Sequence, residues 1–160
     1  MKDHLHAASL EFRTLLEENA SVIADAGYMP FRDFPTGCCE ASTHLLAHHL
    51  IARGLCEAGE IRMPWNNFDD TGEWGSSSHG WISLRCGINI DITADQFQGI
   101  DEPAIVSTNH PVHQRFVGGE WVSFEEHHRR ATCHDGGESF GRVWALLTND
   151  KPNKSQHPTA

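Results

Sequence analysis

The sequence predicts a single α+β domain, with N-terminal helices packed on an antiparallel β-sheet. Apolar residues follow helical spacing in the N-terminal third of the chain, and short runs of strand-like character, separated by turn residues, come after it. The length of 160 residues and the hydrophobic content of 39% are typical of one domain with one packed core. We expect this domain over residues 1–148 and a polar, unfolded tail over residues 149–160.

Two helices are expected before the sheet. Apolar residues recur at intervals of three and four over residues 3–26, and Gly27 ends this run. Residues 28–37 contain two prolines and a glycine, so this segment should be irregular. The second helix should cover residues 39–53, because this stretch has no helix breaker and is followed by Gly54.

Strands are expected in the remainder of the chain. Two β-branched or alternating runs, residues 78–86 and 88–93, should form a tight hairpin around Gly87. The polar loop before them, residues 66–78, is long enough to have a function and could gate access to a site. Further strands of the same sheet are expected over residues 104–107, 112–117, 120–124 and 142–148, whereas residues 124–134 could be helical.

Composition limits the partners. The formal net charge of −10 disfavours nucleic acid and anionic membrane surfaces, because both are bound mainly through Lys and Arg. No apolar run approaches the roughly 20 residues that span a bilayer, and the N-terminus lacks the apolar run of a signal peptide. Five cysteines without a CxxC pair are typical of reduced thiols. These features predict a cytoplasmic protein that acts on a neutral or basic substrate.

Cys38 and Cys39 stand where the second helix should begin. The free N–H groups and the positive dipole end of a helix N-terminus stabilise a thiolate, and they can also hold the oxyanion of a tetrahedral intermediate. Gly37 would allow a substrate to approach the backbone closely. Helix geometry alone permits either cysteine as a nucleophile.

The predicted hairpin supplies an imidazole and a carboxylate. A thiolate nucleophile needs a histidine partner, and that histidine needs a group that orients its other ring nitrogen. His79 begins the first strand and Asp91 lies on the second, so a tight hairpin brings the two residues together. Trp81 shares a face with His79 and could screen the pair from water. Asn89 and Asp95 are rivals to Asp91, although Asp95 more often caps a turn.

These residues resemble the transglutaminase-like branch of the papain-like thiol enzymes. The matching motifs are Gly37-Cys38-Cys39 at a helix start, His79-Gly80-Trp81, and Asp91-Ile92-Thr93, all within residues 31–97. The resemblance implies a papain-like core and a catalytic triad of Cys39, His79 and Asp91. It selects Cys39 over Cys38, because the glycine before the nucleophile and the serine after it both align with Cys39.

Four further residues are possible accessory residues at the site. They are Cys38, Trp81, Asn89 and Gln96. The backbone N–H of Cys39 is the candidate oxyanion donor, with Gln96 as a weaker one, since the chain has no glutamine where papain keeps its donor. Gly80 stands in place of the commoner small residue after the histidine, and Ile92 stands in place of proline.

The implied chemistry is attack of a thiolate on an amide or ester carbonyl. The substrate would be a peptide, a protein or a small amide or ester, and no cofactor is expected. Because a triad of this kind serves several reactions, the enzyme could be a peptidase, an amidase, a deamidase or a transglutaminase-like acyltransferase. One alternative is an inactive papain-like fold that binds a peptide or protein. The sequence makes no prediction of oligomeric state.

A second alternative is a zinc-binding protein with histidine and cysteine ligands. His44 and His48 are one helical turn apart, and Cys133-His134 follow His127-His128. Because neither a CxxC pair nor an HExxH motif is present, we predict no metal site. Separately, the final segment NDKPNKSQHPTA resembles the translated ends of mobile integron gene cassettes, which implies a horizontally acquired bacterial gene.

Overall fold

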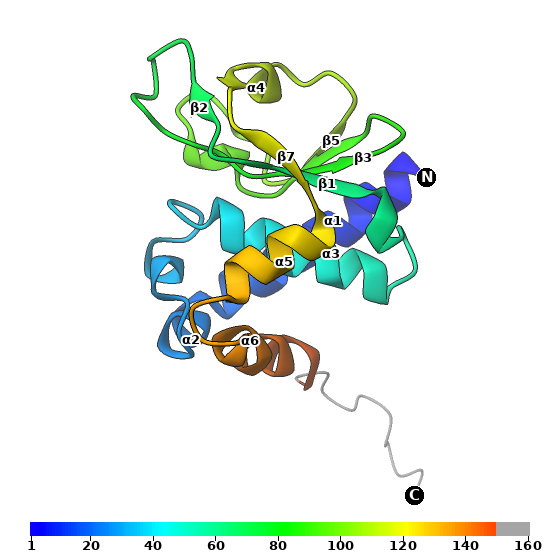
Figure 1. Ribbon diagram of the computed structural model, residues 1–160, viewed down its shortest axis with the longest axis vertical. Coiled ribbons are helices and arrows are strands. Elements are labelled where there is room, and N and C mark those ends of the chain that lie inside the picture. The colour runs from blue at the N-terminus through cyan, green and yellow to red at the C-terminus, as the bar shows by residue number, and fades with distance from the viewer. Residues whose placement is uncertain (150–160) are drawn as a thin grey trace, which may run out of the picture.

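The chain begins and ends with helices and has its antiparallel strands in between, in the computed structural model that describes residues 1–149 (Figure 1). The α-helices are α1 (Lys2–Glu18), α2 (Ala20–Asp25), α3 (Cys39–Ala52), α4 (Pro111–Gln114), α5 (Phe124–Thr132) and α6 (Glu138–Asn149). The strands are β1 (Ile61–Trp65), β2 (Phe68–Asp69), β3 (Ile82–Leu84), β4 (Asn89–Asp91), β5 (Ile105–Ser107), β6 (Phe116–Val117) and β7 (Glu120–Ser123). Short 3₁₀ helices cover Met29–Asp33, Ala58–Glu60 and Ala94–Gln96.

Five strands form an antiparallel sheet in the order β5-β4-β3-β1-β7, and β2 pairs with β6 in a separate ribbon. Helices α1, α3 and α5 cross beneath the large sheet, and α6 lies at the opposite end of the molecule (Figure 1). The α+β prediction is therefore confirmed. Residues 150–160, where the unfolded tail was predicted, lie outside the described residues, whereas Asn149 ends α6.

The predicted first helix is in fact two helices. Asn19 leaves the helical conformation, with φ −111° and ψ 9°, and its side-chain amide donates to Leu15 O at 2.9 Å. Asparagine side chains compete with the backbone for hydrogen bonds in this way, which explains the break. On α1, Leu5, Phe12 and Leu16 are buried and form one side of the main core.

Helix α3 was predicted correctly, and it is the central element of the fold. Leu45, Leu46 and Leu50 are fully buried, and the polar Ser42 and Thr43 beside them are buried too, whereas Ala41 is only half-buried. A helix that is buried on most of its faces must lie inside the domain. α3 packs against both α1 and α5, so the helix that begins with Cys39 lies between two others.

The hairpin was also predicted correctly, but its strands are shorter. β3 and β4 pair with Ile82 opposite Ile90, and Gly87 turns the chain at φ +87°. His79 precedes β3 instead of beginning it, because its backbone N–H and C=O bond to the side chain of Asn67 and not to a neighbouring strand. The prediction that His79 begins the strand is wrong for this reason.

The C-terminal half agrees with the sequence only in part. Strands β5 and β7 and helix α5 form where they were expected, and Ser123 Oγ caps α5 by accepting from Glu126 N at 3.2 Å. Residues 112–117 begin as the helical turn α4, because Pro111 favours a helix start, and only Phe116–Val117 extend as a strand. These two residues belong to the small ribbon, so a strand of the main sheet was wrongly predicted here.

Residues 142–148 form most of α6 and not a strand. Val143 and Leu147 are buried one turn apart, and Phe140 and Trp144 pack beside them, so the apolar spacing is helical. In the part of the chain that the structure describes, no helix has the length and apolar character needed to cross a membrane.

Candidate active site

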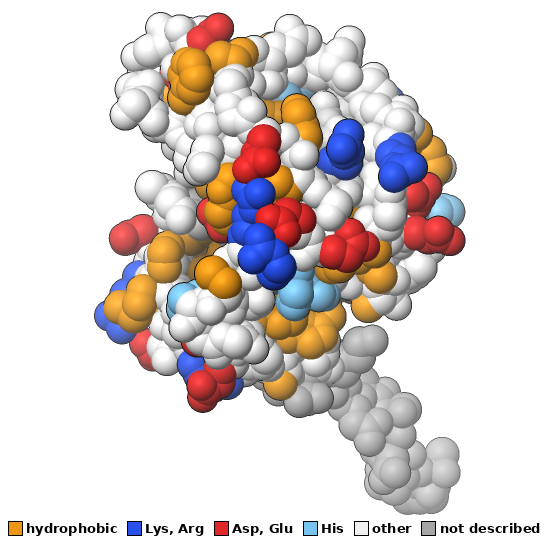
Figure 2. Space-filling view, in the orientation of Figure 1, with side chains coloured by type: hydrophobic (Ala, Val, Ile, Leu, Met, Phe, Trp, Pro, Cys, Tyr) orange, Lys and Arg blue, Asp and Glu red, His pale blue; other side chains and the backbone are white. Residues whose placement is uncertain are grey.

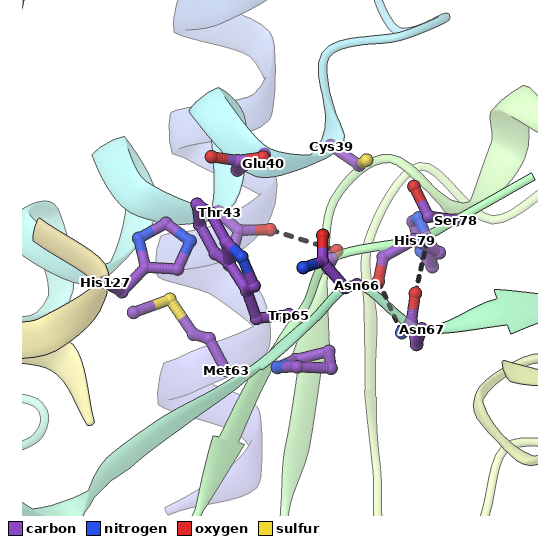
Figure 3. Close-up of a pocket in the computed structure, with 12 residues that line it drawn as sticks. Cys39, Glu40, Thr43, Met63, Trp65, Asn66, Asn67, Ser78, His79 and His127 are labelled. Atoms are coloured by element: carbon purple, nitrogen blue, oxygen red, sulfur yellow. Dashed lines mark hydrogen bonds between the residues drawn. The ribbon is translucent and has the colours of Figure 1, made fainter. Parts of the chain in front are cut away.

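The two adjacent cysteines have different surroundings. Cys38 is buried, and its thiol donates to the carbonyl oxygen of Pro30 at 3.1 Å. Burial raises the pKa of Cys38 to about 12, so this thiol stays protonated. Cys39 is the first residue of α3, is half-buried, and lines a pocket in which its sulfur points towards the side where Ser78 and His79 lie (Figure 3). Accessibility therefore separates Cys39 from Cys38.

His79 is held in place by a residue that the sequence did not single out. The Asn67 side chain donates to His79 O at 2.8 Å and accepts from His79 N at 2.9 Å, and both residues are buried (Figure 3). Such a two-point contact fixes the backbone that carries the imidazole. A lone asparagine in a polar loop has no distinguishing pattern, which is why sequence reasoning missed it.

Gly80 brings this segment close to the start of α3. A Cβ at position 80 would lie 3.5 Å from Cys39 O, which is ordinary van der Waals contact, so an alanine would also fit there. Thr43 Oγ1 donates to Gly80 O at 3.0 Å and ties the segment to the second turn of the helix. This hydrogen bond holds the segment of His79 close to the start of α3.

The His79 and Asp91 side chains form a buried pair. His79 Nε2 lies 2.7 Å from Asp91 Oδ2, and neither side chain is accessible to solvent. The other ring nitrogen, Nδ1, is buried and has no hydrogen-bond partner within the described residues, so it is the nitrogen left for a thiol. This arrangement orients the imidazole as a thiol enzyme requires.

Electrostatics favour the charged form of this pair. Burial alone lowers the pKa of His79, but the Asp91 carboxylate and the nearby Cys39 thiol outweigh it and raise that pKa to about 9. Burial raises the pKa of Asp91, whereas His79 and His113 together bring it well below its usual value. An imidazolium beside a carboxylate is therefore the favoured state at neutral pH.

His113 is a second histidine on the same carboxylate. Its Nε2 lies 3.0 Å from Asp91 Oδ2, while Asp91 Oδ1 accepts from Thr93 N at 3.0 Å. Its ring stacks on Trp81 with ring centroids 4.7 Å apart. The sequence analysis missed His113 because it expected a strand where α4 forms.

The possible accessory residues lie at different distances from the pocket of Cys39. Trp81 is buried against His113 and lies 5.8 Å from the His79 ring, as expected for a screen against water. Gln96 donates to Thr93 O at 2.8 Å and accepts from Gly37 N at 3.2 Å, so it anchors the loop before Cys39. Asn89 is half-buried on β4 and does not line the pocket of Cys39.

The pocket beside Cys39 lies between the start of α3 and the end of β1 (Figure 3). It is lined by Cys39, Glu40, Thr43, Met63, Pro64, Trp65, Asn66, Asn67, Ser78, His79, Gly80 and His127. Asn66 is exposed in it with φ +55°, a conformation that asparagine tolerates better than most residues. The loop that follows is anchored by Asp69, which accepts from the backbone N–H groups of Thr71 and Trp74.

A second group of histidines lies between α3 and α5. His44 Nε2 and His48 Nε2 are 2.9 Å and 3.1 Å from His128 Nδ1. Burial, reinforced by the neighbouring histidines, lowers the pKa of His44 to about 2 and that of His48 to about 4. Cys133 and His134, which the zinc hypothesis also named, are exposed and lie outside this group.

Comparison of the chain with protein-family models, with curated proteins and with solved structures gives no match. The resemblance to transglutaminase-like enzymes thus stays a prediction. Function is inferred below from the chemistry of the residues around Cys39.

Proposed function

We propose that this chain is a cysteine hydrolase or acyltransferase with a papain-like, transglutaminase-like core, acting on an amide or ester bond of a peptide, a protein or a small molecule. The observation that carries this proposal is the buried pair of His79 and Asp91 beside the accessible thiol of Cys39. The parts follow one another as the resemblance implies, from the helix start through His79 to Asp91 at the end of β4.

In the first half of the reaction, the thiolate of Cys39 attacks the carbonyl carbon and forms a tetrahedral intermediate. The imidazolium of His79 then gives its proton to the leaving amine or alkoxide as the carbon–heteroatom bond breaks. A thioester on Cys39 remains. Asp91 holds the imidazole in the correct direction and stabilises its charged form throughout.

In the second half, His79 removes a proton from the acyl acceptor, which attacks the thioester and releases the Cys39 thiolate. Water as acceptor makes the chain a hydrolase, and a primary amine makes it an acyltransferase. The oxyanion can be held by the backbone N–H of Cys39, which lies in the first turn of α3 and has no partner inside that helix. The Asn66 side chain, exposed in the same pocket, is a candidate second donor.

Acetylation by 4-nitrophenyl acetate tests the proposal without knowledge of the natural substrate. We expect 4-nitrophenolate release and an acetyl thioester on Cys39, located by peptide mass spectrometry. Cys39→Ser should abolish the thioester and His79→Gln should slow its formation. Cys38→Ser is the matched control, because it changes the neighbouring thiol yet leaves the nucleophile in place, and it should retain acetylation.

The outcome separates the proposed enzyme from an inactive binding fold. If folded His79→Gln acetylates Cys39 as fast as the unmodified chain, His79 does not activate the thiol, and the inactive alternative is favoured. Adding a primary amine to the acetylated protein then distinguishes the two acceptors. Amide product indicates an acyltransferase, whereas free acetate alone indicates a hydrolase.

A further inference from the structure

Three imidazoles from two helices converge on one point. His44 and His48, one turn apart on α3, direct their Nε2 atoms at Nδ1 of His128 on α5. The three nitrogen atoms lie within 4.8 Å of one another, and no other His, Cys, Asp or Glu of the described chain joins them. His48 and His128 are half-buried, so the group lies near the protein surface. Figure 2 shows histidine side chains exposed among charged side chains on this face of the molecule.

Hydrogen bonding alone does not satisfy this arrangement. A ring nitrogen has either one hydrogen or one in-plane lone pair, so His128 Nδ1 can form an ordinary hydrogen bond with only one of its two neighbours. The other contact, at 2.9 Å or 3.1 Å, can then have at best a share of the same hydrogen or lone pair. A cation between the three nitrogen atoms would use all three lone pairs at once.

The spacing also suits a metal. Zn–N bonds of 2.0–2.1 Å in tetrahedral geometry place two ligand nitrogens about 3.3 Å apart, close to the two contacts measured here. Imidazole nitrogen is a preferred ligand of zinc and of neighbouring transition metals. His48 and His128 are half-buried, so water can reach a fourth coordination position.

Apolar aromatic side chains surround the three imidazoles, as they often surround metal ligands in proteins. Phe140 lies 4.8 Å and 4.6 Å from the His44 and His48 rings, and Phe124 and Trp144 lie 4.8 Å and 5.5 Å from the His48 ring. An apolar shell of this kind limits water and holds the ligands in position.

From these contacts we propose that His44 Nε2, His48 Nε2 and His128 Nδ1 bind one divalent transition-metal ion, most suitably Zn²⁺, at a site distinct from the catalytic centre. The ion would fasten α5 to α3 and so brace the helix that carries Cys39. His44 lies five positions after Cys39 on α3, which is roughly 7.5 Å along the helix axis, so the ion does not touch the thiol.

Zinc analysis on the full chain, purified without a histidine tag, tests the site. The protein carries Cys39→Ser, so that the catalytic thiol cannot supply a ligand. We expect one equivalent of Zn²⁺ after dialysis and an increase in Tm on zinc addition. Competition with a chromophoric chelator should show a zinc affinity at least about 100-fold weaker in His48→Gln and in His128→Asn. Removing a metal ligand should weaken binding more than removing a residue that only hydrogen-bonds to a ligand, which typically costs about 10–100-fold.

His134→Gln is the matched control, because it removes an exposed histidine just beyond α5 and should leave zinc affinity unchanged. Cobalt(II) gives a second readout that does not depend on variants. Visible d–d absorption without a thiolate-to-cobalt charge-transfer band is expected for three imidazole ligands. A charge-transfer band, no bound zinc, or zinc affinity unchanged in both folded ligand variants would overturn the proposal.

Discussion

Replacing Asp91 by asparagine removes the charge that supports His79 while keeping the size of the side chain. Asp91 accepts from His79 and His113 at Oδ2 and from Thr93 N at Oδ1. An asparagine must turn its NH₂ group towards one of these donors. The variant therefore loses both the charge and one hydrogen bond, and the His79 imidazolium loses its main support.

The size of the effect follows from the pKa of His79. Asp91 and Cys39 raise this pKa from 6.5 to about 9, although burial acts in the opposite direction. Without the carboxylate, the pKa should fall to the ordinary value or below, which is a loss of about 3 kcal/mol in favour of the imidazolium. At pH 7 the protonated fraction of His79 should therefore fall about 4-fold or more.

Alkylation of Cys39 by iodoacetamide reports on how well His79 supports the thiol. The exposed Cys86 and Cys133 are replaced by serine, and the labelled peptide is identified by mass spectrometry. At about pH 7, Asp91→Asn should react at least about 4-fold more slowly than the parent protein, because less of its His79 is protonated.

Asp95→Asn is the matched control. Asp95 pairs with Arg13 at 2.8 Å outside the pocket, so its loss should lower stability without slowing alkylation. If a folded Asp91→Asn variant is labelled as fast as the parent, Asp91 does not support the imidazolium. If Asp95→Asn slows labelling instead, the wrong carboxylate has been placed in the triad.

Three further predictions concern the groups around His79. Asn67→Ala leaves two buried backbone groups of His79 without partners and should lower the free energy of unfolding by about 2 kcal/mol or more, measured by urea denaturation, with slower alkylation of Cys39. His113→Phe keeps a ring against Trp81 but removes one hydrogen bond to Asp91, so it should lower the free energy of unfolding by about 1.5–3 kcal/mol. Because Asp91 then supports His79 alone, the alkaline limb of the pH profile of Cys39 alkylation should shift to higher pH. An unchanged profile would contradict the shared carboxylate. The raised pKa of His79 contributes stability that is complete below about pH 6.5 and is lost as the pH rises through about 9, so unfolding free energy should fall by up to about 3 kcal/mol over this window, and Asp91→Asn should flatten the fall.

Local sequence determined the elements that carry the proposed nucleophile. Residues 39–52 contain helix-forming side chains between a glycine-containing turn and Gly54, so α3 and the position of Cys39 at its first turn were predictable. The hairpin followed from two β-branched runs and Gly87, so the sequence could place His79 near Asp91, although Asn89 and Asp95 remained rivals. These features depend on backbone preferences over a few neighbouring residues.

Tertiary structure alone decided which side chains surround that pair. His113 reaches Asp91 across 22 residues, and Asn67 reaches His79 across 12, through packing that no local pattern encodes. The exclusion of Cys38 likewise depends on its burial against Pro30.

The histidine group was likewise only partly predictable from the sequence. His44 and His48 were recognisable as one helical turn apart, yet His128 joins them only because α5 packs against α3. Residues 142–148 could be interpreted as a strand from their apolar character, and only their packing as α6 places Trp144 beside His48. Short apolar runs suit either a helix or a strand, and the burial available in the folded chain determines which of the two forms.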